Sequence, residues 1–158
     1  MTTTELITKF YESFSNANAE GMTDCYHENI RFEDPAFGTL IGNDAKNMWR
    51  MLIERSKGEI KITFSDIKAN DTKGTAKWIA EYNFSKTGRK VINHVSAEFE
   101  FQEGKIIKHI DHFDIWKWSM QAFGWKGYLL GWTSFMKNKI QKESNLLLRD
   151  YVKRVHVV

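Results

Sequence analysis

The chain has 158 residues, of which 42% are apolar and 27% charged, with a net charge of +3 and a single proline. This length and composition predict one globular domain and exclude a disordered chain. They also exclude a membrane-spanning chain, because no apolar run approaches the ~20 residues of a transmembrane helix.

The N-terminal segment 1–14 contains an early acidic residue and lacks the apolar core of a signal peptide. The chain has one cysteine, Cys25, which excludes an internal disulfide and suits a reducing compartment. We therefore expect a cytoplasmic protein.

Helical spacing of apolar residues dominates the first third of the chain. Thr2 and Glu5 have the spacing of a capping box at the start of a helix. Pro35 must end the short strand before it, because proline donates no hydrogen bond to a sheet. The expected elements are a helix to residue 15, a short helix at 22–26, a strand at 30–34, a loop to residue 42 and a helix at 43–55.

From residue 59 onward the apolar pattern changes to a period of two, which is typical of strands. The expected strands are 60–69, 75–85, 89–101 and 105–118. Their short connections predict an antiparallel meander rather than parallel units with crossover helices. Helices followed by one curved antiparallel sheet give an α+β fold.

The last hairpin can be placed in register from its turn. A three-residue loop at 102–104 would pair Ala97 with His109 and Val95 with Asp111. Side chains alternate along a strand, so this register turns His109 and Asp111 toward the apolar face. An acid and a base inside an apolar face are the first indication of a functional site.

Residues 119–158 differ in character from the rest of the chain. Glycines interrupt a run of aromatic residues, which predicts short helical turns followed by helices near 134–142 and 144–153. This segment has seven Lys and Arg against two Asp and Glu. Because these charges are spaced rather than clustered, we expect packing on the domain or a partner subunit and no nucleic-acid binding. Contact with a membrane surface is the less favoured alternative.

The run at 27–35, followed by Phe37, Gly38 and Gly42, resembles the nuclear transport factor 2-like superfamily. More narrowly, it resembles the SnoaL-like polyketide cyclases and the ketosteroid isomerases. The resemblance covers about residues 6–118.

This resemblance implies a cone-shaped fold in which helices pack on a strongly bent antiparallel sheet around an apolar pocket. It divides the chain into a SnoaL-like domain at 1–118 and a helical extension at 119–158. It also implies a homodimer and a small hydrophobic ligand.

In the ketosteroid isomerases, the aspartate of a matching Asp-Pro pair is the general base, which implies this role for Asp34. A carboxyl group in an apolar cavity has a raised pKa, which suits proton abstraction next to a carbonyl group. The two oxyanion donors of these enzymes would correspond to Phe10 and Ala97, so both are missing. Asp34 could instead only hold the backbone before Pro35.

A second comparison is with the limonene epoxide hydrolase-like members of the superfamily. Their last strand carries an acid two residues before a Phe, which Asp111 and Phe113 match. Their Arg-x-Asp pair would fall within 78–82 and is not present there. Neither named reaction therefore transfers to this chain.

The candidate catalytic residues are Asp34, His109 and Asp111, and no cofactor is expected. His109 could act as acid or base near neutral pH. A purely structural His–Asp pair and a metal site completed by Asp34 remain alternatives. The expected walls of the ligand pocket are apolar and mainly aromatic: Phe10, Phe14, Met48, Trp49, Met51, Trp78, Tyr82, Ala97, Phe99 and Phe113.

Two functions of different class follow from these observations. The first is a cofactor-independent enzyme of isomerase, cyclase or hydrolase type that acts on a small apolar carbonyl compound or epoxide. The second is a binding or dimerisation module whose pocket holds an apolar ligand without turnover.

Overall fold

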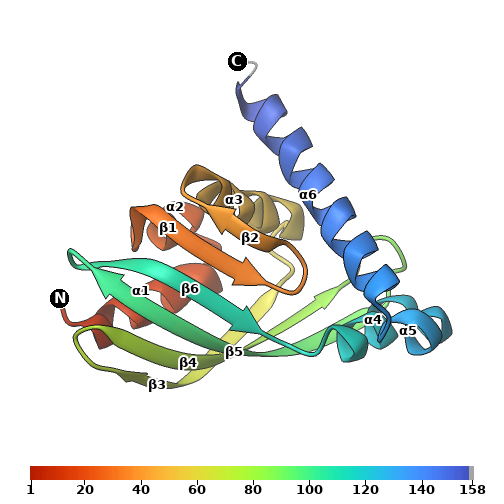
Figure 1. Cartoon of the computed structure of the whole chain (residues 1–158), viewed down its shortest axis with the longest axis horizontal. Coiled ribbons are helices and arrows are strands. Elements are labelled where there is room, and N and C mark those ends of the chain that lie inside the picture. Colours follow the sequence, from red (N-terminus) through yellow and green to blue (C-terminus); the bar gives the residue numbers. More distant parts are fainter. Residues whose placement is uncertain (157–158) are drawn as a thin grey trace.

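The computed structural model describes residues 1–156, which form helices packed on one strongly curved six-stranded sheet (Figure 1). The strand order is β2-β1-β6-β5-β4-β3. Only β1 and β6 run parallel, and the other neighbours are antiparallel. The expected α+β cone is confirmed. The strands are β1 (Tyr26–Asp34), β2 (Gly38–Ile41), β3 (Lys61–Ala69), β4 (Lys73–Asn83), β5 (Lys90–Gln102) and β6 (Lys105–His112).

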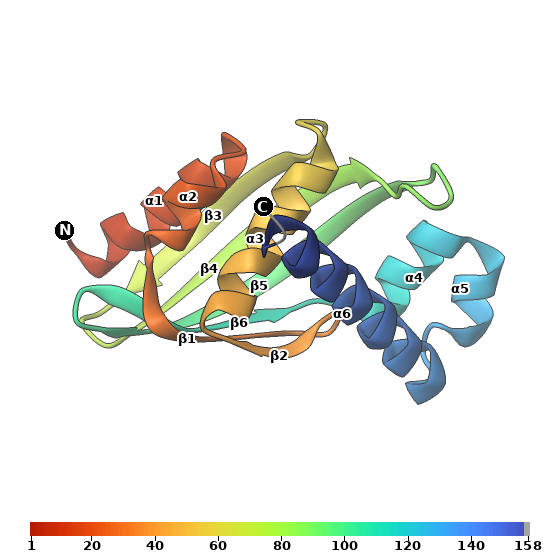
Figure 2. The ribbon, with the colours of Figure 1, turned by 90° about the horizontal axis from the view of Figure 1, so that it is seen from above.

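The helices of the first third cover the concave face of the sheet (Figure 2). The capping box at the start of the first helix is present, since the Thr2 side chain accepts from the Glu5 backbone and the Glu5 side chain accepts from that of Thr2. The apolar stripe of this helix is buried against the sheet. The helices are α1 (Thr3–Ser15), α2 (Ala19–Thr23), α3 (Asn43–Ser56), α4 (Ile115–Phe123), α5 (Trp125–Leu130) and α6 (Ser134–His156).

Several expected boundaries were wrong. The short helix expected at 22–26 is α2 at Ala19–Thr23, and β1 begins at Tyr26 rather than at residue 30. The loop expected before residue 42 contains β2, which pairs with β1 as a sheet edge. The strand expected to reach residue 118 ends at His112, because the Asp114 side chain accepts from the backbone N–H groups of Trp116 and Lys117 and so begins α4.

The turn of the last hairpin also differs from the expectation. Glu103 and Gly104 form a two-residue turn with φ of 53° and 73°, as a type I′ turn requires. A bulge at Ile107 then shifts the register, so that Ala97 pairs with Asp111 rather than with His109. The extra residue restores the alternation, so His109 and Asp111 both face the core as predicted.

The C-terminal extension ends in one helix of 23 residues rather than the two helices expected. Its middle packs against α3 and the turn after β1 (Figure 1). Gln141 Nε2 donates to the backbone oxygen of Pro35, and Asn145 Nδ2 donates to that of Phe37. Leu148 on α6 is buried in the same core as the first helix.

Leu148→Ala is expected to lower the free energy of unfolding by about 2–3 kcal/mol, because it removes buried apolar volume and leaves a cavity. Leu147 is the matched control, since it is 40% exposed on the same helix. Leu147→Ala should change stability by less than about 0.5 kcal/mol. Urea denaturation measures both values, and equal losses would contradict the packing of α6 on the core.

Candidate functional site

A row of hydrogen-bonded side chains crosses the inside of the cone, with His109 at its centre. Tyr26 Oη lies 2.7 Å from His109 Nδ1, and Asp111 Oδ1 lies 2.8 Å from His109 Nε2. At the two ends, Trp49 Nε1 donates to Tyr26 Oη at 2.8 Å and Trp78 Nε1 donates to Asp111 Oδ1 at 3.2 Å. The row joins three strands and one helix.

The direction of each proton follows from these partners. Trp49 Nε1 can only donate to the Tyr26 oxygen, which leaves the tyrosine proton available for Nδ1 of His109. Nε2 on the opposite side of the ring then donates to an oxygen of Asp111. Burial, with the Asp111 charge as a smaller cause, raises the pKa of Tyr26 well above its usual value, so the hydroxyl keeps its proton.

Aromatic rings surround this row of side chains, in the interior where the sequence predicts a ligand pocket. The ring centroid of Phe99 lies 4.5 Å from that of His109, that of Phe32 5.2 Å and that of Phe10 5.4 Å. The Trp49 ring stacks on the imidazole at 6.1 Å. His109 is fully buried and Asp111 is 3% exposed, so neither group is open to solvent.

The expected pocket walls do gather in this interior, with two exceptions. Tyr82 and Phe113 are only partly buried. The Tyr82 hydroxyl accepts from Trp118 Nε1 at 2.7 Å and so belongs to the contact with α4. The other expected wall residues are buried together in the core: Phe10, Phe14, Met48, Trp49, Met51, Trp78, Ala97 and Phe99.

Asp34 ends β1 immediately before the proline turn and is partly buried. Its Oδ1 accepts from the backbone N–H groups of Ala36 at 2.9 Å and Phe37 at 2.6 Å. Those are the bonds expected of a structural role at a strand end. Its Oδ2 makes no hydrogen bond within residues 1–156. Burial raises the pKa of Asp34 to about 7, with the Asp111 charge as a further cause and the two backbone bonds opposing it.

The structure therefore brings two of the three predicted catalytic residues into contact and places the third beside them. Phe32 pairs with His109 across the parallel strands, so the next step along this face sets Asp34 beside Asp111. The hydrogen-bonded partners of Asp34 are backbone groups, not His109 or Asp111. Asp34 therefore lies beside the buried His109–Asp111 pair without a hydrogen bond to either residue.

The raised pKa of Asp34 makes stability depend on pH. The native carboxyl group holds its proton up to about pH 7, whereas the unfolded one ionises near 3.8. The native state binds more protons between these values, so this contribution to the free energy of unfolding is lost as the pH rises from about 4 to 7. Asp34→Asn removes this loss and keeps an Oδ1 acceptor for the backbone.

Relative to wild type, Asp34→Asn should gain stability between pH 4 and pH 8, by at most about 4 kcal/mol and by less where solvent reaches the carboxyl group. Urea titrations of both proteins at the two pH values measure this gain. Glu33→Gln, one residue earlier on β1, is the control and should show no such gain. A pH-independent difference between wild type and Asp34→Asn would contradict the raised pKa.

Two tyrosines that the sequence reasoning did not select belong to this site. Tyr26 was expected in a short helix, but β1 begins at this residue and places its hydroxyl against His109. Tyr11 follows Phe10 on α1, and its buried hydroxyl has no hydrogen-bond partner within the described chain. Extending the strand pattern before residue 30 would have found Tyr26, whereas no sequence signal identifies Tyr11.

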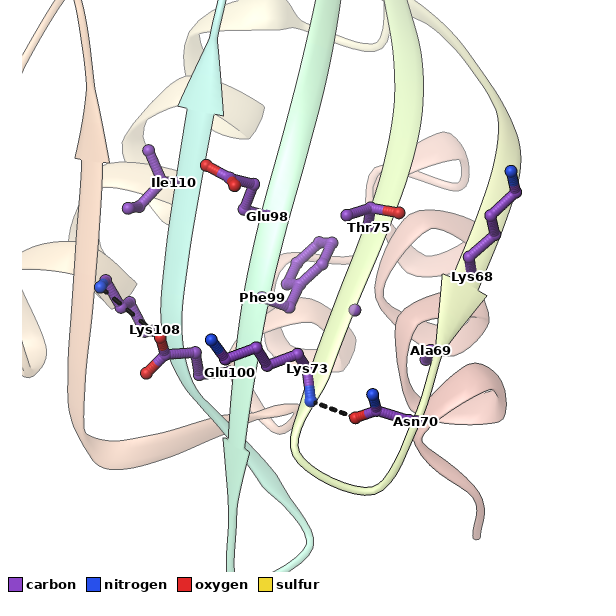
Figure 3. A pocket seen from close by; sticks show the side chains of 11 residues that line it. Lys68, Ala69, Asn70, Lys73, Thr75, Glu98, Phe99, Glu100, Lys108 and Ile110 are labelled. Carbon is purple, nitrogen blue, oxygen red and sulfur yellow. Dashed lines mark hydrogen bonds and ion pairs between the residues drawn. The ribbon is translucent and has the colours of Figure 1, made fainter.

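A hollow of about 480 Å³ lies on the outer face of the sheet rather than in the cone (Figure 3). Charged side chains from neighbouring strands border it, including the pair Glu100 and Lys108. This hollow is separate from the His109 row, because Glu98 and Ile110 point away from the core side. Among residues 1–156, no three His, Cys, Asp or Glu side chains group as metal ligands would.

Solved structures share the fold at low sequence identity. One, provisionally assigned as a polyketide cyclase from Xanthomonas campestris pv. campestris, is 19% identical with a TM-score of 0.61, over 75% of this chain and 95% of that one. A nuclear transport factor 2-like protein of unknown function from Burkholderia pseudomallei is 16% identical with a TM-score of 0.64, over 78% and 99%. AclR from Streptomyces galilaeus, provisionally assigned as a hydroxylase, is 14% identical with a TM-score of 0.61, over 80% and 95%.

No curated protein matches the chain significantly. A family model does match, and it covers residues 7–109 under the description SnoaL-like domain. This range begins within α1 and ends within β6 at His109, before Asp111 and the C-terminal extension. The chain therefore belongs to the SnoaL-like family, and it shares its fold with nuclear transport factor 2-like proteins.

Proposed function

We propose that the protein binds a small, largely apolar carbonyl compound beside Asp34 and moves a proton with this carboxyl group, without a cofactor. The chemistry would be of the isomerase or cyclase type. The observation that carries the proposal is a carboxyl group with a pKa of about 7 at the edge of an aromatic interior. A base is most effective when its pKa lies near the working pH.

The fixed orientation of Asp34 supports a role as base. Two backbone N–H groups hold Oδ1, which leaves Oδ2 without a hydrogen bond among the described residues and available to a substrate proton. A carboxyl group that is already held in place loses less entropy when it takes up a proton from a substrate. The unpartnered hydroxyl of Tyr11 would offer a buried donor to a carbonyl oxygen, because burial, with the Asp111 charge as a lesser cause, raises the pKa of Tyr11 and keeps it protonated.

His109 and Asp111 would act through Asp34 rather than on the substrate. Both are buried and fully engaged with each other, Tyr26 and Trp78. The negative charge of Asp111 disfavours ionisation of Asp34 on the neighbouring strand and so helps to raise its pKa. In this proposal the two are positioning residues, and Asp34 is the catalytic residue.

A model ketone tests the proposal without knowledge of the natural substrate. Exchange of the α-protons of 2-tetralone for deuterium in heavy water, followed by proton NMR, reports a general base directly. We expect exchange above the buffer rate that rises with pH and levels off above about pH 7. Exchange equal to buffer across this range would contradict the proposal.

The runner-up function is a non-catalytic ligand-binding module. The observation that favours it is that packed rings bury His109 and Asp111, so that neither of these two acid–base groups can reach a ligand. Chemical-shift changes of the Trp49 and Trp78 indole N–H signals on adding 2-tetralone, without α-proton exchange, would support this alternative.

A further inference from the structure

Six large apolar side chains project from one end of the molecule into solvent. They belong to α5, the following turn and the start of α6, and we refer to residues 125–135 as the aromatic tip. Monomeric proteins rarely expose a continuous apolar patch of this kind without a partner. The exposed fractions are 69% for Trp125, 58% for Tyr128, 54% for Leu129, 44% for Leu130, 69% for Trp132 and 70% for Phe135.

The local packing forces this exposure. The inward positions of the tip are glycines: a Cβ atom on Gly127 would clash with the backbone oxygen of Ser119 on α4, and one on Gly131 would lie 2.7 Å from the Cβ atom of Ser119. α5 therefore rests on α4 through its backbone. Since no bulky side chain fits between the two helices, the large apolar residues of α5 must point outward.

The charges around the aromatic tip all have one sign. Residues 115–142 contain five Lys and no Asp or Glu. Lys126 lies within the tip, and Lys137 and Lys139 follow on the first turns of α6, where all three are exposed. The patch is therefore both aromatic and basic.

We propose that the aromatic tip docks on the surface of an anionic lipid bilayer. Tryptophan and tyrosine favour the boundary between acyl chains and headgroups, and lysines reach from there to anionic headgroups. None of the helices within residues 1–156 is long and apolar enough to cross a bilayer, so the tip would lie on the membrane rather than span it.

Charge selects the lipid surface over a second copy of the chain. A symmetric contact between two copies would bring the same patch against itself and so oppose lysines with lysines. An anionic surface instead gains about 1 kcal/mol, or roughly fivefold in partitioning, from each lysine close to it.

The shape of the molecule allows this contact. α4, α5 and the start of α6 lie together at the end of the molecule opposite the N-terminus (Figure 2). From there α6 runs back to the turn after Asp34, where Gln141 and Asn145 bind the backbone. The turn after Asp34 is therefore held by a part of α6 that follows the tip and lies outside it.

Flotation with vesicles tests the proposal on the full chain. We expect binding to phosphatidylcholine vesicles that contain phosphatidylglycerol, and at least tenfold weaker binding to phosphatidylcholine alone. The triple variant Trp125→Ala, Trp132→Ala, Phe135→Ala should lose binding. The double variant Lys126→Glu, Lys137→Glu should lose roughly 25-fold or more, from two lysines at about fivefold each.

Matched controls separate this effect from general loss of surface charge or apolar area. Ile41→Ala removes an apolar side chain that is 53% exposed on β2, and Lys73→Glu reverses an exposed charge on β4. Both should bind vesicles like wild type, and circular dichroism checks that every variant is folded.

Three results would overturn the proposal. The first is equal affinity for neutral and anionic vesicles, and the second is binding that the triple variant retains. The third is a dimer in analytical ultracentrifugation that dissociates in the triple variant, with no vesicle binding by wild type, which would assign the tip to a second copy. None of these results depends on catalysis, so they are independent of the function proposed for Asp34.

Discussion

Replacing Asp34 with Asn is expected to lower the rate of α-proton exchange in 2-tetralone by about 10²–10⁴-fold at pH 8, the usual contribution of a general base. At this pH the wild-type carboxyl group is largely ionised, because its pKa is about 7. An amide cannot accept the proton. The rate of exchange by NMR, at equal protein concentration, measures the effect.

The design of this experiment separates chemistry from folding. Asp34→Asn should be at least as stable as wild type at pH 8, so a lower rate would not arise from unfolding. Glu33→Gln alters a neighbouring carboxyl group that pairs with Arg31 outside the site, and it should keep the wild-type rate. If Asp34→Asn exchanged protons as fast as wild type, Asp34 would not be the base.

His109→Ala is expected to lower the free energy of unfolding by about 3–5 kcal/mol, because it removes a large buried ring and a buried hydrogen-bond partner of both Asp111 and Tyr26. The change leaves the Asp111 carboxylate with Trp78 as its hydrogen-bond donor and leaves the Tyr26 hydroxyl without its acceptor. It also opens a cavity among the surrounding rings, which adds to the loss. Urea denaturation at pH 7 gives the value.

His112 provides the matched control on the same strand. It points to the outer face, where it pairs with Glu98 at 2.6 Å and both side chains are well exposed. His112→Ala should change stability by less than about 0.5 kcal/mol, as is usual for substitutions of exposed side chains. A loss for His109→Ala no larger than that for His112→Ala would show that the buried row does not stabilise the fold.

Much of this architecture follows from patterns within the sequence. Alternation along 108–112 was enough to turn His109 and Asp111 inward, because it places them together on one face of the strand, opposite Lys108 and His112. The Thr2 capping box and the change of period near residue 59 located the first helix and the start of the meander. These signals are local, so tertiary contacts did not override them.

The features that the sequence did not predict depend on distant contacts. β2 is a short edge strand that exists through its pairing with β1. Trp49 and Trp78 were expected to line a ligand pocket, yet their indole N–H groups bind Tyr26 and Asp111 instead. The alternation of side chains gives the side of a strand on which a residue lies. It does not show whether that residue lines an open cavity or fills the space with its own side chain.

The bulge at Ile107 decides which residues of β6 face the core. With the two-residue turn at Glu103 and Gly104 alone, even-numbered residues of β6 such as Ile106 and Lys108 would pair with the inward residues of β5 and would themselves face inward. The extra residue at Ile107 shifts the pairing by one position, so that His109 and Asp111 face inward instead. A single insertion or deletion between the turn and His109 would therefore exchange the two faces, whereas a compensating pair would preserve them. Related chains could thus vary in turn length and still keep the buried row, provided that turn and bulge change together.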